Sequence, residues 1–297
     1  FVFPDLCRIR IWPQIFGSLS PQARELLSSM IAPMIYWGYS LSMVPIYYLQ
    51  HPFFEQYKIQ SDQSWPWLDK RPEVRHEFWK LSRKSLKLAC LNLFVFLPFA
   101  VSLRCKALVY LNIEHMSFET DDASWPSHFT ILRDNILLTV LHEFGFYWTH
   151  RIMHTYPSLY KYHKVHHEYK INTAFAAQHN HPVDYFISIL TPVLFATTLI
   201  GSHSMSVVIF MVWAIMANMD DHVGYSFPWS PVRWFPFAAL TDEHEFHHSK
   251  NLGCFGSKLS IFNELFGGYK HYALWVRNET IRCATDRASV KVAMKAD

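Results

Sequence analysis

The sequence is poor in charged residues. Asp, Glu, Lys and Arg make up 17% of its 297 residues, whereas they make up about a quarter of an average soluble domain. Apolar residues make up 51% and aromatic residues 17%. A chain of this composition is too apolar to stay disordered, and it lacks the dense basic surface of a nucleic-acid-binding protein. Its net charge of +3 is also too small to predict a polyanionic partner.

Paired cysteines are also absent. The five cysteines are scattered and never form a Cys-x-x-Cys pair: Cys7, Cys90, Cys105, Cys254 and Cys283. Their odd number and spacing argue against a disulfide framework and a thiolate metal site, and they fit a reducing environment that faces the cytosol. No internal repeat divides the chain, so we expect a single domain over residues 1–297. Because residue 1 is Phe, we also expect the native N-terminus to be missing.

Long uncharged stretches are present at Leu26–Phe54, Leu88–Leu103 and Tyr185–Met219. A helix crosses the apolar core of a bilayer with about 20 residues. The third stretch has 35 residues, enough for two short helices with a turn at Gly201–Ser204. The alternative, buried helices of a large soluble protein, is disfavoured because so long an uncharged run is rare in soluble folds. The sequence therefore predicts an all-α protein with multi-pass transmembrane helices at about 26–54, 86–104, 129–149 and 185–219.

The loops predict the orientation of these helices. Glu55–Lys87 contains eight Lys and Arg residues, whereas Arg104–His128 contains two basic and four acidic residues. The positive-inside rule places the first loop in the cytosol and the second in the lumen. The chain then returns to the cytosol near His150, which predicts a helical cap on the cytosolic side. On this topology the span at 26–54 is either a full crossing or a re-entrant or interfacial helix.

Histidine is abundant, with 18 residues, of which thirteen lie between His142 and His248. Eight of them form three groups with strict spacing: His150 and His154; His163, His166 and His167; and His244, His247 and His248. Residues three or four apart share one face of a helix, so we expect each group to present its imidazoles to one point. Imidazole is neutral near pH 7 and is the commonest metal-ligating side chain. A lone histidine is usually structural, but three such groups together predict a metal site.

The number of histidines predicts the number of ions. Eight imidazoles exceed the six positions around one octahedral ion, so we expect two ions, and the lone residues His181 and His222 extend the candidate set to ten. Imidazole suits iron, zinc, copper and nickel, so the spacing does not name the metal. Carboxylates close in sequence can hold the ring N–H groups of ligands, although each is equally a candidate for a solvated charge. These carboxylates are Glu143, Asp184, Asp221 and Asp242.

Other classes of metal protein remain alternatives. His244-Glu245-Phe246-His247-His248 matches the HExxH pattern of zinc proteases. One zinc needs only three protein ligands and a water, however, which leaves the groups at 150–167 unexplained. A metal transporter or storage protein would place histidines along a path through the membrane. A catalytically inactive scaffold would normally have lost ligands, whereas all three groups are intact.

The motifs resemble the fatty acid hydroxylase/sterol desaturase superfamily of membrane di-iron oxygenases. HxxxH, HxxHH and, after a hydrophobic hairpin, a second HxxHH follow in that order over His150–His248. The similarity extends roughly from Tyr57-Lys58-Ile59-Gln60 to Phe266-Gly267-Gly268. Within the superfamily, that tetrad and the segments Tyr160–His167 and His222–Trp229 look like the C-4 methylsterol oxidase branch. Those enzymes oxidise a sterol methyl group stepwise, using O2 and electrons from NAD(P)H through cytochrome b5.

Three segments depart from that branch. His181-Pro182-Val183-Asp184 looks more like the C-5 sterol desaturases. Gly145-Phe146-Tyr147 stands where Trp-His-Tyr is usual, and Gly253-Cys254-Phe255-Gly256 replaces a Gly-Asn-Tyr. Hydroxylation and desaturation both begin with hydrogen abstraction, so both remain open from the sequence.

The resemblance implies two iron ions held by the ten histidines, with no catalytic residue beyond these ligands. It also implies an electron-donor protein, a sterol-like lipid substrate and an endoplasmic reticulum membrane with the active site facing the cytosol. An unactivated C–H bond has no acidic proton, so side-chain acid–base chemistry cannot break it, whereas a redox metal with O2 can. We therefore expect a monooxygenase of a sterol-like methyl group; the alternatives are a C-5-type desaturase and a hydroxylase of a fatty-acyl or other lipophilic substrate.

Overall fold

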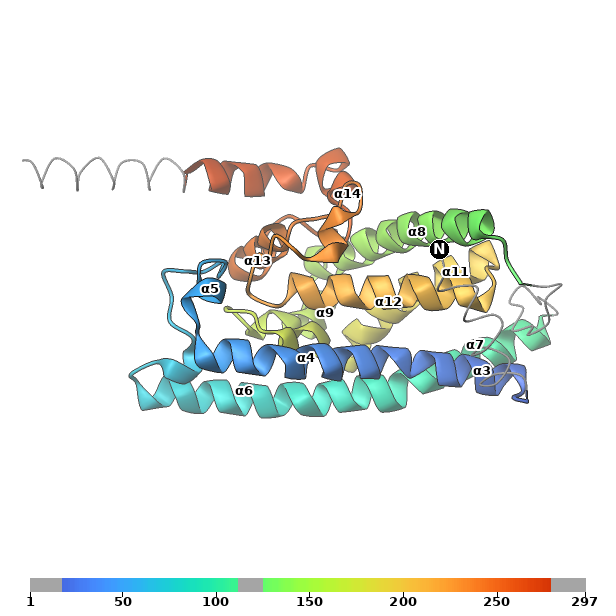
Figure 1. Ribbon diagram of the computed structural model, residues 1–297, viewed down its shortest axis with the longest axis horizontal. Coiled ribbons are helices and arrows are strands. Elements are labelled where there is room, and N and C mark those ends of the chain that lie inside the picture. The colour runs from blue at the N-terminus through green and yellow to red at the C-terminus, as the bar shows by residue number, and fades with distance from the viewer. Residues whose placement is uncertain (1–17, 112–124, 279–297) are drawn as a thin grey trace, which may run out of the picture.

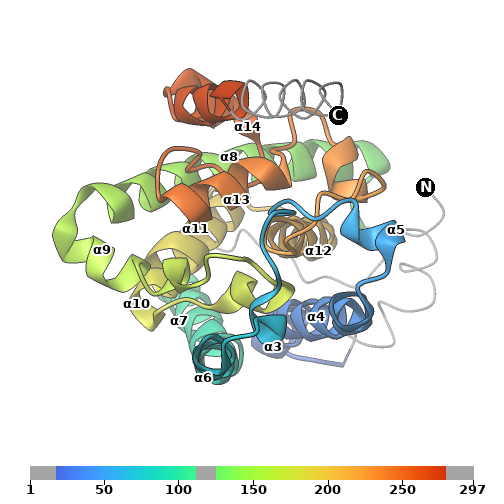
Figure 2. The ribbon, with the colours of Figure 1, turned by 90° about the vertical axis from the view of Figure 1, so that its left-hand side faces the viewer.

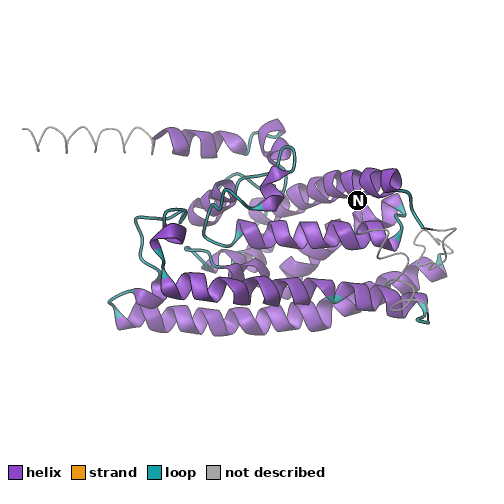
Figure 3. Cartoon of the chain, in the orientation of Figure 1, coloured by secondary structure: helices purple, strands orange, loops and turns teal. Residues whose placement is uncertain are grey.

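The computed structural model describes residues 18–111 and 125–278. These residues form helices joined by loops, without a β-strand (Figure 3). The predicted all-α fold is confirmed. The α-helices are α3 (Pro21–Ser29), α4 (Ile31–Leu49), α5 (Pro52–Glu55), α6 (Pro72–Leu91), α7 (Leu97–Tyr110), α8 (His128–Thr155), α9 (Pro157–His163), α10 (Pro182–Asp184), α11 (Thr191–Ile200), α12 (Ser204–Asp221), α13 (Thr241–Lys250) and α14 (Ser260–Leu265).

Within residues 18–111 and 125–278, shorter turns of other helix types interrupt this series. Two are π-helical, η3 (Asn92–Phe96) between α6 and α7 and η6 (Tyr185–Leu190) between α10 and α11. Four are 3₁₀ turns: η2 (Pro66–Leu68), η4 (His166–Glu168), η5 (Ala174–Gln178) and η7 (Pro231–Trp234). Each π-helical turn therefore lies inside a longer continuous helix.

Among the described residues, three helices are long and apolar enough to cross a membrane: Pro72–Tyr110, Pro182–Ile200 and Ser204–Asp221. The first contains the stretch predicted at 86–104, and the other two cover the stretch predicted at 185–219. The helices over the other two predicted stretches, α4 and α8, do not reach this composition. In α4 several tyrosines and serines dilute the apolar residues, and α8 carries Arg133, Asp134 and Glu143.

The turn between α11 and α12 lies at Gly201–His203, within the predicted segment. Gly201 has the left-handed backbone conformation (φ 61°) that glycine adopts without strain, and it ends α11. His203 begins α12 as its N-cap, with Nδ1 accepting a hydrogen bond from the backbone N–H of Met205. The two helices of this hairpin pack on α8, and α12 also packs on α4. Figure 2, a view along the long axis, shows α12 end-on near the centre of the bundle.

Two segments that carried the sequence resemblance lie against each other. Lys58 and Tyr225 form an isolated antiparallel bridge, and the backbone N–H of Ile59 donates to the carbonyl of Gly224 at 3.1 Å. Gly224 has a positive φ of 75°, and a Cβ there would lie 2.6 Å from the carbonyl oxygen of Asn172. The bridge between Lys58 and Tyr225 and the bond from Ile59 to Gly224 fix the loop after α5 beside the loop after α12. Both loops lie next to the end of the bundle that contains the histidines.

Candidate metal centre

The clustered histidines lie close together in the structure, although they come from five segments of the chain. The C-terminal end of α8, the end of α9, the turn η4, the C-cap of α12 and helix α13 supply them. In Figure 1 these segments lie together at one end of the long helices rather than along them. A metal transporter would need histidines along a path through the bundle, and these segments do not form such a path.

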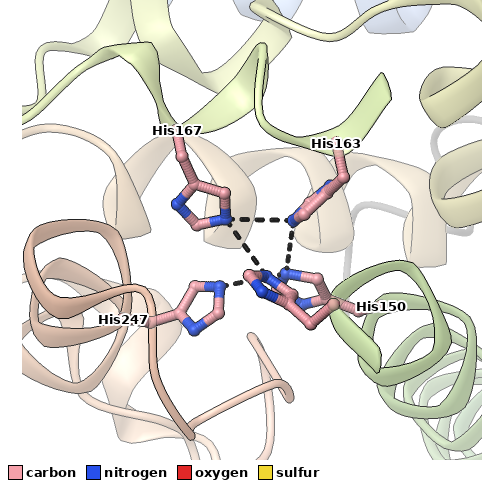
Figure 4. Close-up of side chains that lie close together, drawn as sticks. His150, His163, His167 and His247 are labelled. Carbon is pink, nitrogen blue, oxygen red and sulfur yellow. Dashed lines mark hydrogen bonds between the residues drawn. The ribbon is translucent and has the colours of Figure 1, made fainter. Parts of the chain in front are cut away.

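Five histidines form a first group, in which one ligand atom from each residue lies within 4.8 Å of all the others. They are His150, His154, His163, His167 and His247. The Nε2 atom of His163 is 3.0 Å from that of His150 and 3.0 Å from that of His167. Dashed lines in Figure 4 mark these short contacts, and the labelled rings point toward one another from α8, α9, η4 and α13.

Four histidines form a second group with the same spacing, namely His166, His222, His244 and His248. The Nε2 atom of His222 lies 3.3 Å from that of His166 and 3.0 Å from that of His244. The Nε2 atom of His248 lies 3.1 Å from that of His244. The two groups are adjacent, because the rings of His167 and His248 have centroids only 4.7 Å apart.

The expectation that each sequence motif faces one point is wrong for both HxxHH segments. In the first, His163 and His167 join the first group and His166 joins the second. In the second, His244 and His248 share a face of α13 and join the second group, whereas His247 joins the first. On α13 the physical reason is that residues i+3 and i+4 lie on opposite sides of residue i, about 100° apart around the helix axis, so their rings reach neighbouring points. In the first segment His163 ends α9, whereas His166 and His167 lie in the separate turn η4.

Hydrogen bonds on the far side of the rings fix several of the imidazoles. His150 Nδ1 donates to the carbonyl oxygen of Phe255 at 2.7 Å, and His247 Nδ1 donates to that of Gly253 at 2.6 Å. His163 Nδ1 donates to Asp184 Oδ2 at 3.0 Å. A carbonyl or carboxylate oxygen only accepts, so the proton of each ring is on Nδ1. The Nε2 atoms of these three rings therefore carry lone pairs.

These lone pairs indicate a cation. The Nε2 atom of His150 is 3.0 Å from that of His163 and 3.1 Å from that of His247. Two lone pairs at this distance repel each other, so the contacts are not hydrogen bonds. Imidazole binds a transition metal at about 2.1 Å, so ligands at right angles around one ion lie about 3.0 Å apart. The first group therefore has the donor set, the tautomers and the spacing of a metal site, and the second repeats the spacing.

Burial keeps these imidazoles neutral and able to act as ligands. His150, His244 and His247 are at most 2% exposed. Burial, with the neighbouring histidines as a smaller cause, lowers the pKa of each of these three rings well below its usual range. Burial also lowers the pKa of His222 to about 4, against the opposing effect of the bond from its ring to the carbonyl of Asn218. Neutral imidazole is the form that binds metal.

Only one of the four predicted acidic neighbours holds a ligand ring, and that is Asp184. Glu143 instead accepts the backbone N–H groups of Ser257 and Lys258, at 2.7 and 3.0 Å. The Asp221 carboxylate accepts from the hydroxyl of Ser257. The Oδ1 atom of Asp242 has no hydrogen-bond partner in the described part of the chain. The prediction of a role beside the ligand rings is thus wrong for these three carboxylates, because helix geometry turns Glu143 and Asp221 toward the loop at 257–259.

His181 lies outside both groups. Its Nδ1 accepts a hydrogen bond from the backbone N–H of Val183 at 3.2 Å, where it caps the short helix α10, and its ring packs on Tyr162 with centroids 4.8 Å apart. The structure thus brings nine of the ten candidate histidines together and gives the tenth a capping contact.

The sequence missed the backbone carbonyls that fix the rings of His150 and His247, because every residue type supplies the same carbonyl. Gly253 and Cys254 both have a positive φ, 61° and 47°. This left-handed turn aims the carbonyls of Gly253 and Phe255 at two ligand rings. The unusual Gly-Cys-Phe-Gly segment was the signal in the sequence that this loop is special.

The HExxH interpretation does not fit the geometry. A zinc protease needs its glutamate beside the metal-bound water, but Glu245 is 2% exposed and accepts hydrogen bonds from Asn172 and Gln60. Burial raises the pKa of Glu245, against these hydrogen bonds. The two histidines of the motif also share their group with His166 and His222, which gives four donors where one zinc protease site uses three.

Comparison with known proteins finds a related family. Residues 135–268 match the model of the fatty acid hydroxylase family. The matched residues contain all nine clustered histidines. The predicted resemblance to this superfamily is confirmed.

Similarity to individual proteins extends beyond that domain. The chain is 27% identical over 249 residues to methylsterol monooxygenase 1 of Gallus gallus, covering 82% of this chain and 76% of the relative. It is 27% identical over 270 residues to a very-long-chain aldehyde decarbonylase of Oryza sativa subsp. indica, covering 88% and 91%. It is 27% identical over 258 residues to a cholesterol 25-hydroxylase-like protein of Caenorhabditis elegans, covering 84% and 79%. No solved structure matches the chain.

Proposed function

We propose that this protein is a membrane di-iron oxygenase that hydroxylates an unactivated C–H group of a sterol-like lipid with O2 and externally supplied electrons. The observation that carries the proposal is that Nε2 of His150, with its lone pair, lies 3.0 Å from Nε2 of His163 and 3.1 Å from Nε2 of His247. Such a donor set binds a cation, and nine histidines in two adjacent groups suit two ions.

Two irons would supply the reduction and cleavage of O2 that an unactivated C–H bond requires. The protein's own residues have three tasks in this chemistry. The imidazoles of both groups bind the ions in neutral form. Asp184 and the carbonyls of Gly253, Phe255 and Asn218 hold the ring N–H groups, which sets the direction of each Nε2 lone pair. Burial of the rings excludes bulk water from the space between them.

We propose iron because residues 135–268 match the fatty acid hydroxylase family and because imidazole nitrogens suit iron. Imidazole alone also suits zinc, but the proposed reaction needs a metal that changes oxidation state. We assign no separate catalytic acid or base, and the nine clustered histidines are the proposed ligands. His181 is not part of this proposal, since its ring nitrogen caps α10.

The substrate class follows from the relatives. Methylsterol monooxygenases and a cholesterol 25-hydroxylase-like protein are named for reactions on sterols, whereas the decarbonylase is named for a long-chain aldehyde. A sterol-like substrate with C-4 methyl oxidation is therefore proposed. The segment His181-Pro182-Val183-Asp184 favours a C-5-type desaturase as the second candidate, and an acyl hydroxylase is a third.

The setting of the reaction is part of the proposal. Three apolar helices fit a membrane protein, and we propose the endoplasmic reticulum membrane with the histidines on the cytosolic side. That side carries the basic loop Glu55–Lys87, and the opposite loop lies partly outside the described residues. An electron-donor protein that is fed by NAD(P)H, of the cytochrome b5 type or a reductase, would reach the centre from the cytosol.

Metal analysis and turnover together test the proposal. The full chain, purified in nanodiscs, is expected to contain two irons per chain and to convert a 4-methylsterol to a hydroxylated or carboxylated product when O2 and an electron donor are supplied. Anaerobic incubation is the control and is expected to give no product. A new double bond in the product would favour the desaturase, and a single zinc with no O2-dependent product would contradict the oxygenase.

A further inference from the structure

A narrow cavity of about 120 Å³ lies among α3, α4, α7, α11 and α12. Its walls are mostly aliphatic. On α7 and the π-helical turn before it, the lining residues are Leu93, Leu97, Val101 and Arg104, which recur on one helix face. At 1.5 Å per residue this stripe is about 16 Å long. The cavity is therefore an elongated apolar space that runs along the helices inside the bundle.

One end of the cavity is closed by a buried ion pair. Arg104 Nη1 lies 3.0 Å from Glu25 Oε2, and both side chains are about one-tenth exposed. Arg104 Nε also donates to Thr198 Oγ1 at 3.0 Å. The hydroxyl of Ser28, one turn from Glu25 on α3, lines this end and has no hydrogen-bond partner in the described part of the chain.

The other end adjoins the histidine groups. Tyr185 lines it, and the residue before it is Asp184, which accepts from His163. Gln178 lines it as well. The carbonyl of the preceding residue, Ala177, accepts from the side chain of Asn218, whose own carbonyl accepts from His222. Tyr185 and Gln178 thus each follow, by one position in the sequence, a residue that is hydrogen-bonded to the surroundings of a histidine group.

Both π-helical turns in the described residues contribute to the wall of this cavity. Leu93 belongs to η3, and Tyr185 and Ile189 belong to η6. Such turns are rare and often mark functional sites, because they open the helix and reposition side chains. Here both π-helical turns line the same cavity, and η6 follows directly after Asp184, the partner of His163.

Gln178 is the unusual residue at this end. Its side chain is 6% exposed, and its Oε1 atom has no hydrogen-bond partner among the described residues. Leaving a buried amide oxygen unpaired is unfavourable, so such a group calls for an explanation. A carboxamide both accepts and donates, and it has no charge. A neutral hydroxyl group is its natural complement.

We propose that Gln178 binds the hydroxyl group of a neutral lipid whose apolar body lies in the cavity, so that the hydroxyl end faces the histidine groups. This rests on the proposed function in that it takes the substrate to be a lipid. A lipid carboxylate or phosphate fits less well, because the one cation that lines the described cavity, Arg104, is already paired with Glu25. The cavity is below the 300–1,000 Å³ usual for ligand pockets, so flexible Leu, Ile and Met side chains of the wall must move as the lipid enters.

The test is a binding experiment without turnover. The full chain in nanodiscs is titrated under argon, without reductant, with a fluorescent sterol and with its 3-methyl ether. The wild-type protein is expected to bind the free hydroxyl form about tenfold more tightly, as one neutral hydrogen bond would give. Gln178→Leu is expected to bring this ratio close to one by weakening the hydroxyl form alone. Unchanged affinity for the methyl ether shows that the variant is folded.

Ser28→Ala is the matched control, since it removes an unpartnered hydroxyl from the opposite end of the same cavity. It is expected to leave the ratio unchanged. If Ser28→Ala removes the preference and Gln178→Leu does not, the lipid lies in the reverse direction and the proposal is overturned. The proposal is equally overturned if the wild-type protein does not prefer the free hydroxyl form. It is also overturned if neither variant changes the ratio of the two affinities. Because no turnover is measured, a preference that depends on Gln178 in a protein that oxidises nothing would refute the proposed function and leave this inference standing.

Discussion

The outer surface of the apolar helices and the interior of the histidine end are opposites. On the helices large apolar side chains point outward, as Phe99 (60% exposed) and Leu199 (61% exposed) do. At the histidine end, polar side chains are buried, and His247 and His248 are 0% exposed. In a soluble protein large apolar side chains gather in the core, and buried polar groups need partners. The difference teaches that lipid suits the outer surface of the helices and that the buried imidazoles form groups that could hold a metal.

The largest effect is expected from removing one of the nine clustered histidines. His166→Ala or His247→Ala is expected to lower turnover by more than about a hundredfold, beyond the loss typical for an outer partner of a ligand. Each takes away one metal donor, so metal content should fall as well, while the protein stays in the membrane. Turnover with a sterol substrate and iron content measured by plasma mass spectrometry check this.

The control for the histidine variants is His271→Ala. His271 is exposed and lies outside both groups, so activity and iron content are expected to stay near the wild-type values. Full activity of either the His166 or the His247 variant would contradict its assignment as a ligand.

The next effect concerns the outer surface. Phe99→Arg places a charge on the apolar stretch of the first candidate span, at a cost of about 3 kcal/mol for insertion. We expect the membrane-integrated fraction to fall sharply, as measured by carbonate extraction. Trp79→Arg is the matched change, because Trp79 is 53% exposed on the charged half of α6. Equal loss in both variants would mean that Phe99 does not face lipid.

A smaller effect is expected from Asp184→Asn, which keeps the shape of the partner of His163 and removes its charge. Outer partners of this kind typically contribute 10–100-fold to metal affinity, and we expect a loss of about tenfold. Metal affinity is measured by competition with a chelator. Asp242→Asn removes a carboxylate that touches no ligand ring, so its affinity is expected to match the wild type. Equal weakening of both variants would remove Asp184 from its supporting role.

The smallest expected effect is a difference in stability between two Gly→Ala variants. Gly38 is exposed on α4 with nothing within 4 Å of an added Cβ, so Gly38→Ala is expected to stabilise the helix by about 0.5–1 kcal/mol. At Gly145 on α8 the same Cβ would lie 3.3 Å from Cβ of Pro192 on α11. The gain in helix propensity is therefore offset there, and Gly145→Ala is expected to be neutral or destabilising. Thermal unfolding in detergent measures both, and an equal gain would contradict tight packing of α8 on α11.

The sequence predicted those features that depend on residue type and spacing. Uncharged length marked the helices, a glycine marked the turn at Gly201–His203, and histidine spacing marked the residues that meet. It did not predict which of the two groups each histidine joins, since that depends on how α9 and α13 are rotated. It also did not predict the carbonyls of Gly253 and Phe255, because a backbone oxygen has no signature in the sequence. His181 shares the residue type of the ligands, but its backbone position makes it a helix cap.

The division of both HxxHH segments between the two histidine groups has a consequence for how the centre is assembled. Each ion would be held by rings from the same two pieces of chain that hold its neighbour, so seating one ion orders the donors of the other. Loading should consequently be all-or-none. Titration of the stripped protein with a limiting amount of ferrous ion should give a mixture of empty and doubly filled molecules in native mass spectra, with few carrying a single ion.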